Sequence, residues 1–494
     1  GCGDFGKAWD RNLTDEDGPY IELMTGVYTE NQPDFTWLKP FEEKVFKQYF
    51  MPYKKVGQVK NATIHATLGV ETTDSSVKVT VYATEKYEDA VIVVKNAGKE
   101  IFRKNVVISP EDIFEETIET EVAKEQDICT SVFGGGTLLV TYQAKEEKIP
   151  ELAKPAEAAK QPEEIMTNEE LLLTAQHIEQ HRHATYMPDP YYEEGLKRDP
   201  MDSHINNAYG MLMMRRACYT KAEAMFRTAI KRLTWRSPNP YNSEPYYNLG
   251  LVLFYQDKMD EAYDAFYKAT WSNEQQEMSF YYLAAIEARR GNPESALELI
   301  EKGLVKNMHN IKARGLKAVL LRKLGMTDAA KVWIKENYKV DPFDYVSYME
   351  ASFIDEDKCS EIRAQMNSLM RDFHENYLQT ARDYSEAGFY EEALTVLGEC
   401  SAQWPMIQYY EGYFLSILGK ENEANKKFTE AENCDPTYCF PNKLEDISVL
   451  ETAIRMNPQG AKAYYYLGNL FYDKLQFEKA MHLWETSVDL DDQY

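Results

Sequence analysis

The sequence has few cysteines, an excess of acidic over basic residues, and no long apolar run. Its seven cysteines are an odd number among 494 residues, and none stands in a CxxC pair, so neither a disulfide framework nor a zinc ribbon is expected. The formal charge is −26, which argues against nucleic acid and against an anionic membrane surface, because both need a basic face. No stretch of about 18 apolar residues is present, so we expect no membrane span.

Local signatures of catalysis and cofactor binding are also missing. There is no Walker loop or Ser/His/Asp signature, and the glycines at 134–136 lack the Lys-Ser/Thr that a phosphate loop needs, so they are predicted to form a turn. His177 and His181 lie one helical turn apart and could share a metal, but no further ligand can be placed. We therefore expect no metal site and no cofactor, and any catalysis must come from carboxylates assembled in space.

One pattern repeats with a period of 34 residues between positions 245 and 342. Each unit carries a small residue, a second small residue twelve positions later, and a large apolar residue four positions after that. The three sets are Gly250, Ala262 and Phe266; Ala284, Ala296 and Ile300; and Ala318, Ala330 and Ile334. This spacing places the small residues where two helices cross closely, with the large residue filling the groove beside them. The pattern resembles the tetratricopeptide repeat (TPR), a helix–turn–helix unit.

Further units follow the same rule, so residues 167–494 are predicted to form an all-α TPR solenoid of about seven units with a concave face. The small and large residues of these units include Gly210 and Phe226, Ala381 and Leu397, Gly412 and Phe428, and Gly468 and Trp484. Residues 343–376 and 437–460 break the pattern and are expected to hold extra helix. The inner positions of the solenoid include Asn248, Tyr255, Tyr281, Tyr282 and Arg289, an aromatic mixture that is not typical of a clamp for acidic tails.

Residues 1–56 are predicted to be β structure, with strands at 20–24 and 45–53. Three runs, at 18–26, 31–35 and 38–44, resemble the carboxy-terminal end of a galactose-mutarotase-like β-supersandwich. The sequence departs from that family at Met24, where a glutamine is usual, and at Phe41, where a turn glycine is usual. A glycosidase or lyase on this scaffold is therefore as open as mutarotation.

The mutarotase resemblance implies that Glu22 is a candidate acid/base residue at the mouth of a sugar cleft, a role that burial can support by bringing its pKa toward working pH. An ordinary outward-facing strand carboxylate is the alternative for Glu22. Trp9 and Trp37 are candidate sugar-stacking residues, with a place in the core as the alternative for both.

Residues 57–145 contain short alternating runs separated by turn residues at near-regular spacing, which predicts an immunoglobulin-like β-sandwich. The expected strands are 63–68, 77–83, 90–94, 106–109, 128–133 and 137–142. Residues 146–166 are rich in Lys, Glu, Ala and Pro, a composition that predicts a charged, semi-extended linker.

Two polar, aromatic stretches in the helical half do not follow the repeat spacing. They span 181–194 and 235–244, and the second makes the step from Ala222 to Ala262 forty residues long. Such departures are expected where function overrides packing, and insertions often form the contact surface of a solenoid. The substrate-binding candidates here are His181, His183, Tyr191, Tyr192, Trp235 and Tyr241. Ligand contact and docking of the chain's own β-domain remain equally open.

The chain is predicted to be a multidomain α and β protein. The order of its domains resembles that of a poorly characterised bacterial family in which a mutarotase-like domain precedes a β-sandwich and TPR helices. The first hypothesis is therefore a carbohydrate-active protein, a glycoside hydrolase or sugar epimerase with carboxylate acid/base chemistry, whose TPR helices aid substrate binding or domain packing. The alternative is a non-catalytic TPR scaffold that binds a protein partner on its concave face. Residues 1–10 show no signal peptide, so the bacterial cytoplasm is slightly favoured; the oligomeric state stays open.

Overall fold

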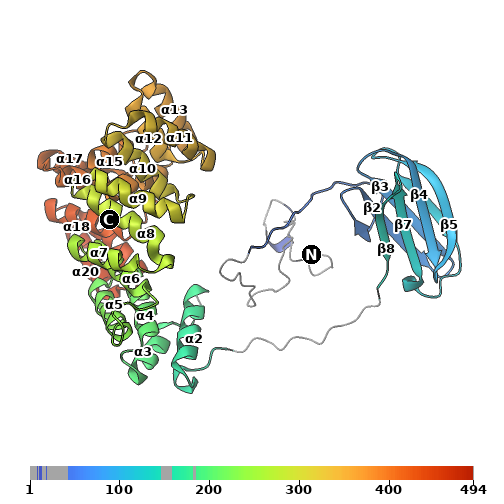
Figure 1. Cartoon of the computed structure of the whole chain (residues 1–494), viewed down its shortest axis with the longest axis horizontal. Coiled ribbons are helices and arrows are strands. Elements are labelled where there is room, and N and C mark those ends of the chain that lie inside the picture. The colour runs from blue at the N-terminus through green and yellow to red at the C-terminus, as the bar shows by residue number, and fades with distance from the viewer. Residues whose placement is uncertain are drawn as a thin grey trace. The chain divides into compact units, whose positions relative to one another are not determined.

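The computed structural model describes residue 8, residues 11–13, residue 18, and residues 43–145, 158–181 and 185–492. The chain divides into two compact units, Gly1–Ala158 and Ala159–Tyr494. All described strands belong to the first unit, and helices α2 to α20 belong to the second (Figure 1). No helix within these described ranges combines the length and the apolar character needed to cross a bilayer.

The first unit contains a β-sandwich of two four-stranded antiparallel sheets. One sheet has the spatial order β1 (Asn61–Ala62), β2 (Ala66–Thr73), β3 (Ser76–Ala83) and β6 (Phe114–Glu119). The other has the order β5 (Lys99–Ile108), β4 (Tyr87–Asn96), β7 (Ile128–Gly134) and β8 (Thr137–Gln143). Alternate side chains of both sheets enter one core, which includes the fully buried Leu68, Val79, Ile92 and Val132. This alternation is what a sheet with one buried face requires.

Tight turns set the register of two hairpins in the sandwich. Ala97 and Gly98, between β4 and β5, have φ of 48° and 79°, and Gly135 and Gly136, between β7 and β8, have φ of 54° and 77°. Positive φ at both central residues is the type I′ geometry that matches strand twist. The glycines at 134–136 therefore form a turn, as predicted. Strand β6 was not predicted, because only two of its residues, Phe114 and Ile118, are buried among polar neighbours.

The segment before the sandwich differs from its prediction. Residues 43–60 contain no strand, so the predicted strand at 45–53 is wrong. Val45, Phe46 and Phe50 are 77%, 57% and 80% exposed. Alternating apolar residues favour a strand only when one face is buried and the backbone is paired, and neither condition holds here. The other predicted strand, at 20–24, lies outside the described residues.

The second unit contains nineteen α-helices among the described residues, most of them in pairs joined by short turns. Their bounds are α2 Asn168–Gln180, α3 Asp189–Arg198, α4 Ser203–Arg215, α5 Tyr219–Leu233, α6 Glu244–Tyr255, α7 Met259–Ala269, α8 Gln276–Arg289, α9 Pro293–Lys306, α10 Ile311–Lys323, α11 Thr327–Val340, α12 Tyr345–Ile354, α13 Cys359–Met370, α14 His374–Glu386, α15 Tyr390–Leu397, α16 Pro405–Ile417, α17 Glu421–Glu432, α18 Glu445–Met456, α19 Ala461–Asp473 and α20 Phe477–Leu490. The extra helices expected in the two breaks of the repeat are α12, α13 and α18.

The helical unit begins before its first long helix. Thr167 caps α2 by accepting a hydrogen bond from the main-chain N–H of Glu170, a position at which threonine is a preferred residue. Upstream of this cap, Tyr191 Oη donates to the main-chain oxygen of Lys160 at 2.9 Å. Arg198 Nη1 donates to that of Ile165 at 2.8 Å. The end of the segment that the sequence identifies as a linker therefore packs on α3.

Close packing within each helix pair follows a size rule at the two repeat positions. A Cβ added to Gly210, Gly250 or Gly412 would lie 2.7, 2.6 or 2.5 Å from the ring of the phenylalanine sixteen residues later, and one added to Gly468 would lie 2.5 Å from the Trp484 ring. Where the first residue is Ala284 or Ala318, the later one is the smaller Ile300 or Ile334. The side-chain volumes thus compensate across each helix crossing, and this geometry identifies the unit as a TPR-like solenoid.

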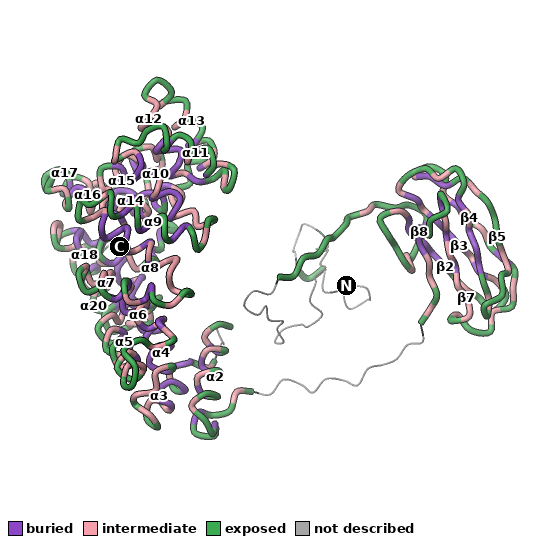
Figure 2. Tube along the Cα trace, viewed as in Figure 1, coloured by how far each residue is buried: buried purple, intermediate pink, exposed green. Residues whose placement is uncertain are grey.

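The solenoid closes on itself. Gln476 Nε2, between α19 and α20, donates to the main-chain oxygen of Arg216 at 2.6 Å, and the adjacent Ala217 is buried in the core of the C-terminal half. In return, Ala387, between α14 and α15, is buried in the core of the N-terminal half. The two halves also meet where Tyr255 of α6 donates a hydrogen bond to Glu445 of α18 at 3.4 Å, and buried positions line both halves (Figure 2). The concave groove of the repeats is therefore partly filled by the chain's own helices.

Candidate functional site

Four of the nine candidate site residues, Trp9, Glu22, Trp37 and His183, lie outside the described residues. The acid/base role of Glu22 and the sugar-stacking roles of the two tryptophans therefore stay predictions. The described residues contain no group of three or more His, Cys, Asp or Glu side chains arranged to hold a metal ion.

Tyr191 and Tyr192 are buried parts of the helical core, only 2% and 1% exposed. Tyr192 stacks on Tyr209 with ring centroids 5.2 Å apart, and its hydroxyl donates to Glu179 at 3.2 Å. Neither ring is accessible to a sugar, so the polar and aromatic character of this stretch reflects packing between α2, α3 and α4. His181 is exposed just after α2, where its ring lies 4.5 Å from that of His177.

Trp235 and Tyr241 lie in the insertion between α5 and α6 and are 69% and 97% exposed. The insertion is held to the end of α7 by Lys268, whose Nζ donates to Asn239 Oδ1 at 2.6 Å, and by Ser272, whose Oγ donates to the main-chain oxygen of Tyr241 at 3.3 Å. The structure thus places these two aromatics on an open rim, and it does not join them with the buried Tyr191 and Tyr192 into one site.

A cavity of about 550 Å³ lies between the two halves of the helical unit, bounded by α6, α8, α14, α15, α16 and α18. Its aromatic wall includes Tyr255, Tyr282, Tyr410 and Tyr413. Three of the inner positions identified from sequence, Tyr255, Tyr282 and Arg289, line this cavity, which confirms their inward orientation. We call this space the central cavity.

The central cavity contains charges of both signs that lack ion-pair partners among the described residues. Arg289 donates to main-chain oxygens, and Arg455 donates to the Thr452 hydroxyl at 3.3 Å. On the acidic side, Glu445 accepts a long hydrogen bond from Tyr255 Oη, at 3.4 Å, and burial raises its pKa. Burial is costly for a charge that has no partner, and this cost falls on the half-buried Arg289 and Glu445, whereas Arg455 is exposed. The cavity therefore suits a ligand that brings complementary charges of both signs together with apolar surface.

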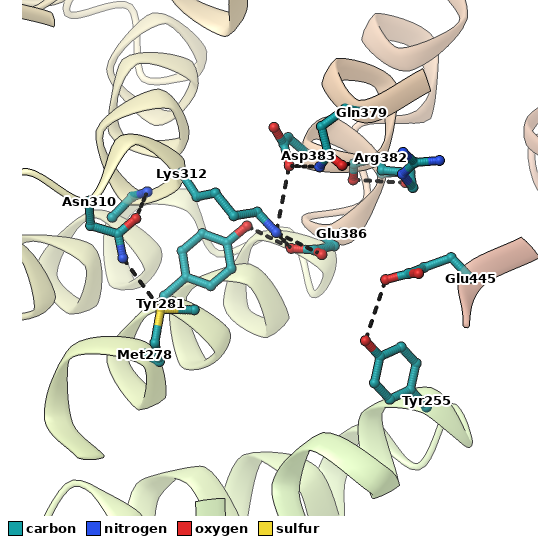
Figure 3. A network of polar contacts seen from close by, with 12 residues as sticks. Tyr255, Met278, Tyr281, Asn310, Lys312, Gln379, Arg382, Asp383, Glu386 and Glu445 are labelled. Carbon is teal, nitrogen blue, oxygen red and sulfur yellow. Dashed lines mark hydrogen bonds and ion pairs between the residues drawn. The ribbon is translucent and has the colours of Figure 1, made fainter. Parts of the chain in front are cut away.

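A network of polar contacts borders one end of the central cavity (Figure 3). The carboxylate of Glu386, the last residue of α14, accepts hydrogen bonds from Tyr281 Oη at 2.7 Å and from Lys312 Nζ at 2.9 Å. Lys312 also lies 3.6 Å from Asp383. Burial alone would lower the pKa of Lys312, but Glu386 and Asp383 raise it. These contacts join α8 and α10 to α14 across the groove.

The Asp383 carboxyl gives this network a pH dependence. Burial raises its pKa to about 6, with the Lys312 ammonium opposing and the Glu386 carboxylate adding to the shift. Between the pKa of an unfolded aspartate, about 3.9, and about 6, the folded chain binds more protons than the unfolded chain. This carboxyl therefore makes the protein less stable as pH rises through that window.

Replacement of Asp383 by asparagine is expected to stabilise the helical unit by about 1–3 kcal/mol at pH 7. The neutral amide removes the penalty of ionisation, and its oxygen can still accept the bond that Gln379 Nε2 donates at 3.0 Å. Urea denaturation at pH 4, 5, 6 and 7 measures the effect, and the advantage of Asp383→Asn should shrink toward pH 4. Asp328→Asn, at an exposed carboxylate of α11, is the matched control. Equal behaviour of the two variants would contradict the prediction.

Sequence reasoning identified Tyr281 as an inner position, but it missed the acidic side of the central cavity and the other members of the network around Glu386. The local sequence offers one signal, since Asp383 and Glu386 are like charges one helical turn apart on α14. Such pairs destabilise an isolated helix, so they indicate a cation supplied from elsewhere. Their partner Lys312 lies more than seventy residues earlier in the chain, and no local pattern connects the two.

Comparison with known proteins gives one family match and several structural likenesses. Residues 61–142 match a family model described as the second domain of YphG-like protein. A tetratricopeptide repeat protein from Parabacteroides merdae is 16% identical, with 52% of this chain and 98% of that chain covered and a TM-score of 0.34. YrrB, described as a TPR protein with an unusual peptide-binding site, is 17% identical, with coverages of 42% and 91% and a TM-score of 0.30. PilF from Pseudomonas aeruginosa is 17% identical, with coverages of 44% and 97% and a TM-score of 0.36. The β-sandwich is thus similar to the second domain of YphG-like proteins, and the helical unit is TPR-like by its own repeat geometry.

Proposed function

We propose that this chain is a non-catalytic TPR scaffold whose central cavity binds a peptide segment of a partner protein. The observation that carries the proposal is the set of charges without ion-pair partners, Arg289 and Arg455 on one side and Glu445 on the other, in a cavity walled by tyrosines. Tyrosine offers a large contact area at low entropic cost. A polypeptide can supply apolar surface and both signs of charge within a few residues, whereas a neutral sugar supplies no charge.

The carbohydrate-active hypothesis gains no support from the described residues. Glu22, its proposed acid/base residue, is outside them, and Tyr191 and Tyr192 are buried. The likeness of the first residues to a mutarotase-like supersandwich therefore stays a separate proposal, as does docking of the β-domain on the TPR surface.

We also propose that the β-sandwich is immunoglobulin-like. With the two-residue β1 set aside, seven strands remain, in the spatial orders β2-β3-β6 and β5-β4-β7-β8. In chain order these are strands 1-2-5 in one sheet and 4-3-6-7 in the other, an arrangement that supports an immunoglobulin-like fold. Its part in the function proposed here is that of a spacer.

The peptide-binding function is tested with a phage-displayed library of random dodecapeptides panned against the full chain. Selected peptides are expected to lose at least about tenfold in affinity, by fluorescence anisotropy, for Arg455→Glu, because the reversed charge repels the acidic group that Arg455 would pair with. Arg455 is exposed at the cavity wall, so its replacement leaves the core intact.

Arg236→Glu is the matched control, because Arg236 is also an exposed arginine and lies in the insertion before α6, outside the cavity wall. This variant should bind the selected peptides as the unmodified chain does. A library that yields no binder, or binders that are insensitive to Arg455→Glu, would contradict the proposed function.

A further inference from the structure

The turn between α14 and α15 occupies the inner face of α8 and α10 much as a bound peptide would. Arg289 Nε donates to the main-chain oxygen of Glu386 at 2.6 Å, and its Nη2 donates to that of Ser385 at 3.0 Å. Carbonyls at the end of a helix lack partners within the helix, and here a guanidinium from another repeat supplies the donors. We call residues 385–388 the plug.

Three residues of the plug contact the inner face through different features. The Glu386 carboxylate accepts from Tyr281 and Lys312. The methyl group of Ala387 is 1% exposed within the core of the N-terminal half. Gly388 has φ of +83°, and a Cβ added there would lie 3.0 Å from Arg289 Cγ and 3.3 Å from its Cα. The inner face therefore favours a different residue at each of three consecutive positions: one with a carboxylate, then one with a methyl group, then glycine.

The contacts that hold the plug are of a kind that a peptide from another molecule could also make. Its anchors are polar groups and one methyl group, whereas paired helices of the repeats are locked by rings such as Phe266 against Gly250. Elements that bury little apolar surface open at lower free energy than the core. Arg289, Ser385 and Glu386 also line the central cavity, so release of the plug would enlarge the space available to a peptide.

We propose that the inner face of α8 and α10 is a recognition surface for a short acidic peptide of the form Glu-Ala-Gly, occupied in this structure by the chain's own plug. A partner segment with this chemistry binds by taking the place of residues 385–388 on Arg289, Tyr281 and Lys312. This inference rests on the proposed function, because it specifies the partner chemistry and the gating of the same cavity.

The test uses a fluorescent peptide with the sequence of residues 382–391, acetylated and amidated at its ends, titrated into the full chain. Glu386→Ala removes the carboxylate that Tyr281 and Lys312 contact and leaves Lys312 with Asp383 alone, so this variant is expected to bind the peptide at least about tenfold more tightly than the unmodified chain. A control peptide with glutamine in place of the glutamate that corresponds to Glu386, and with the other glutamate kept, should bind the variant about tenfold more weakly.

Matched variants locate the binding to this face. Lys312→Met and Tyr281→Phe, each combined with Glu386→Ala, keep side-chain volume and are expected to weaken binding of the peptide. Glu391→Ala removes an exposed carboxylate of α15 outside the contact and should behave as the unmodified chain. Equal affinity for the two peptides, or affinity unchanged by Lys312→Met, would overturn the proposal.

A second measurement does not depend on the stability of any variant. In the unmodified chain, an excess of unlabelled peptide should accelerate amide hydrogen exchange in residues 385–392, because it displaces the plug, and should leave α16 unaffected. Unchanged exchange would overturn the inference.

The two proposals can fail separately. If library peptides bind through Arg455 without sensitivity to Glu386→Ala, this inference fails while the proposed function stands. If only the 382–391 peptide binds, the recognition surface on α8 and α10 is supported and the proposed binding of library peptides in the central cavity fails.

Discussion

Replacement of Arg322 by methionine is expected to destabilise the helical unit by about 3–5 kcal/mol at neutral pH, because it leaves a buried carboxylate without its cationic partner. Arg322 of α10 donates through Nε and Nη2 to the carboxylate of Glu350 on α12, which is fully buried. It also donates to Glu392 of α15 at 2.9 Å. Without the guanidinium, Glu350 keeps only the hydroxyl of Tyr384, which donates at 2.8 Å.

A second variant separates the lost ion pair from lost packing. Arg322→Met with Glu350→Gln removes both charges at similar volume and is expected to recover most of the stability, since a buried pair contributes little over neutral groups of the same shape. Burial raises the pKa of Glu350 even with Arg322 opposing it, so the loss in Arg322→Met should shrink at acid pH as Glu350 takes up a proton.

Urea denaturation at pH 5 and pH 7 measures both variants. The control is Lys339→Met, which breaks the exposed pair of Lys339 with Glu336 one turn away on α11. Exposed pairs of this kind contribute within about 0.5 kcal/mol. If Arg322→Met costs no more than Lys339→Met, the network does not stabilise the solenoid.

The sequence is most predictive where contacts are local. Gly412 and Phe428 lie sixteen residues apart in one helix pair, so the 34-residue period is enough to place them face to face. The same period orients Tyr255 and Arg289 inward. Local patterns mislead at Tyr191 and Tyr192, because a polar, aromatic stretch predicts a contact surface for a ligand or for the β-domain, whereas the two hydroxyls are satisfied inside the core.

Contacts between distant repeats could not be predicted. The pairing of Arg289 with the end of α14 joins residues 97 positions apart, and the contact of Gln476 with Arg216 joins residues 260 apart. Such pairs depend on small rotations accumulated over many repeats, which single residues do not encode. The central cavity and the plug result from these rotations, so they become visible only in three dimensions.

The close helix crossing at Gly412 gives the sharpest test of the repeat geometry. A Cβ at this position would lie 2.5 to 2.9 Å from ring atoms of Phe428, so Gly412→Ala is expected to destabilise the helical unit by about 1–3 kcal/mol through overpacking. Helix propensity alone predicts the opposite change, because replacing glycine with alanine inside a helix stabilises it by about 0.5–1 kcal/mol. Gly398→Ala, where the added Cβ meets nothing closer than 3.4 Å, provides the control and should be neutral or stabilising.

The companion substitution follows from the chain's own repeats. Phe428→Ile alone should cost stability, because the smaller side chain leaves a void against Gly412. Combined with Gly412→Ala it recreates the pair Ala284 and Ile300 of another unit, so the two changes should compensate by about 1 kcal/mol or more in a double-mutant cycle measured by urea denaturation. Simple additivity would mean that the two positions do not pack against each other as the size rule requires. A favourable coupling would instead show that side-chain volume is conserved across each helix crossing, and this conservation is what allows glycine and alanine units to stack in one solenoid.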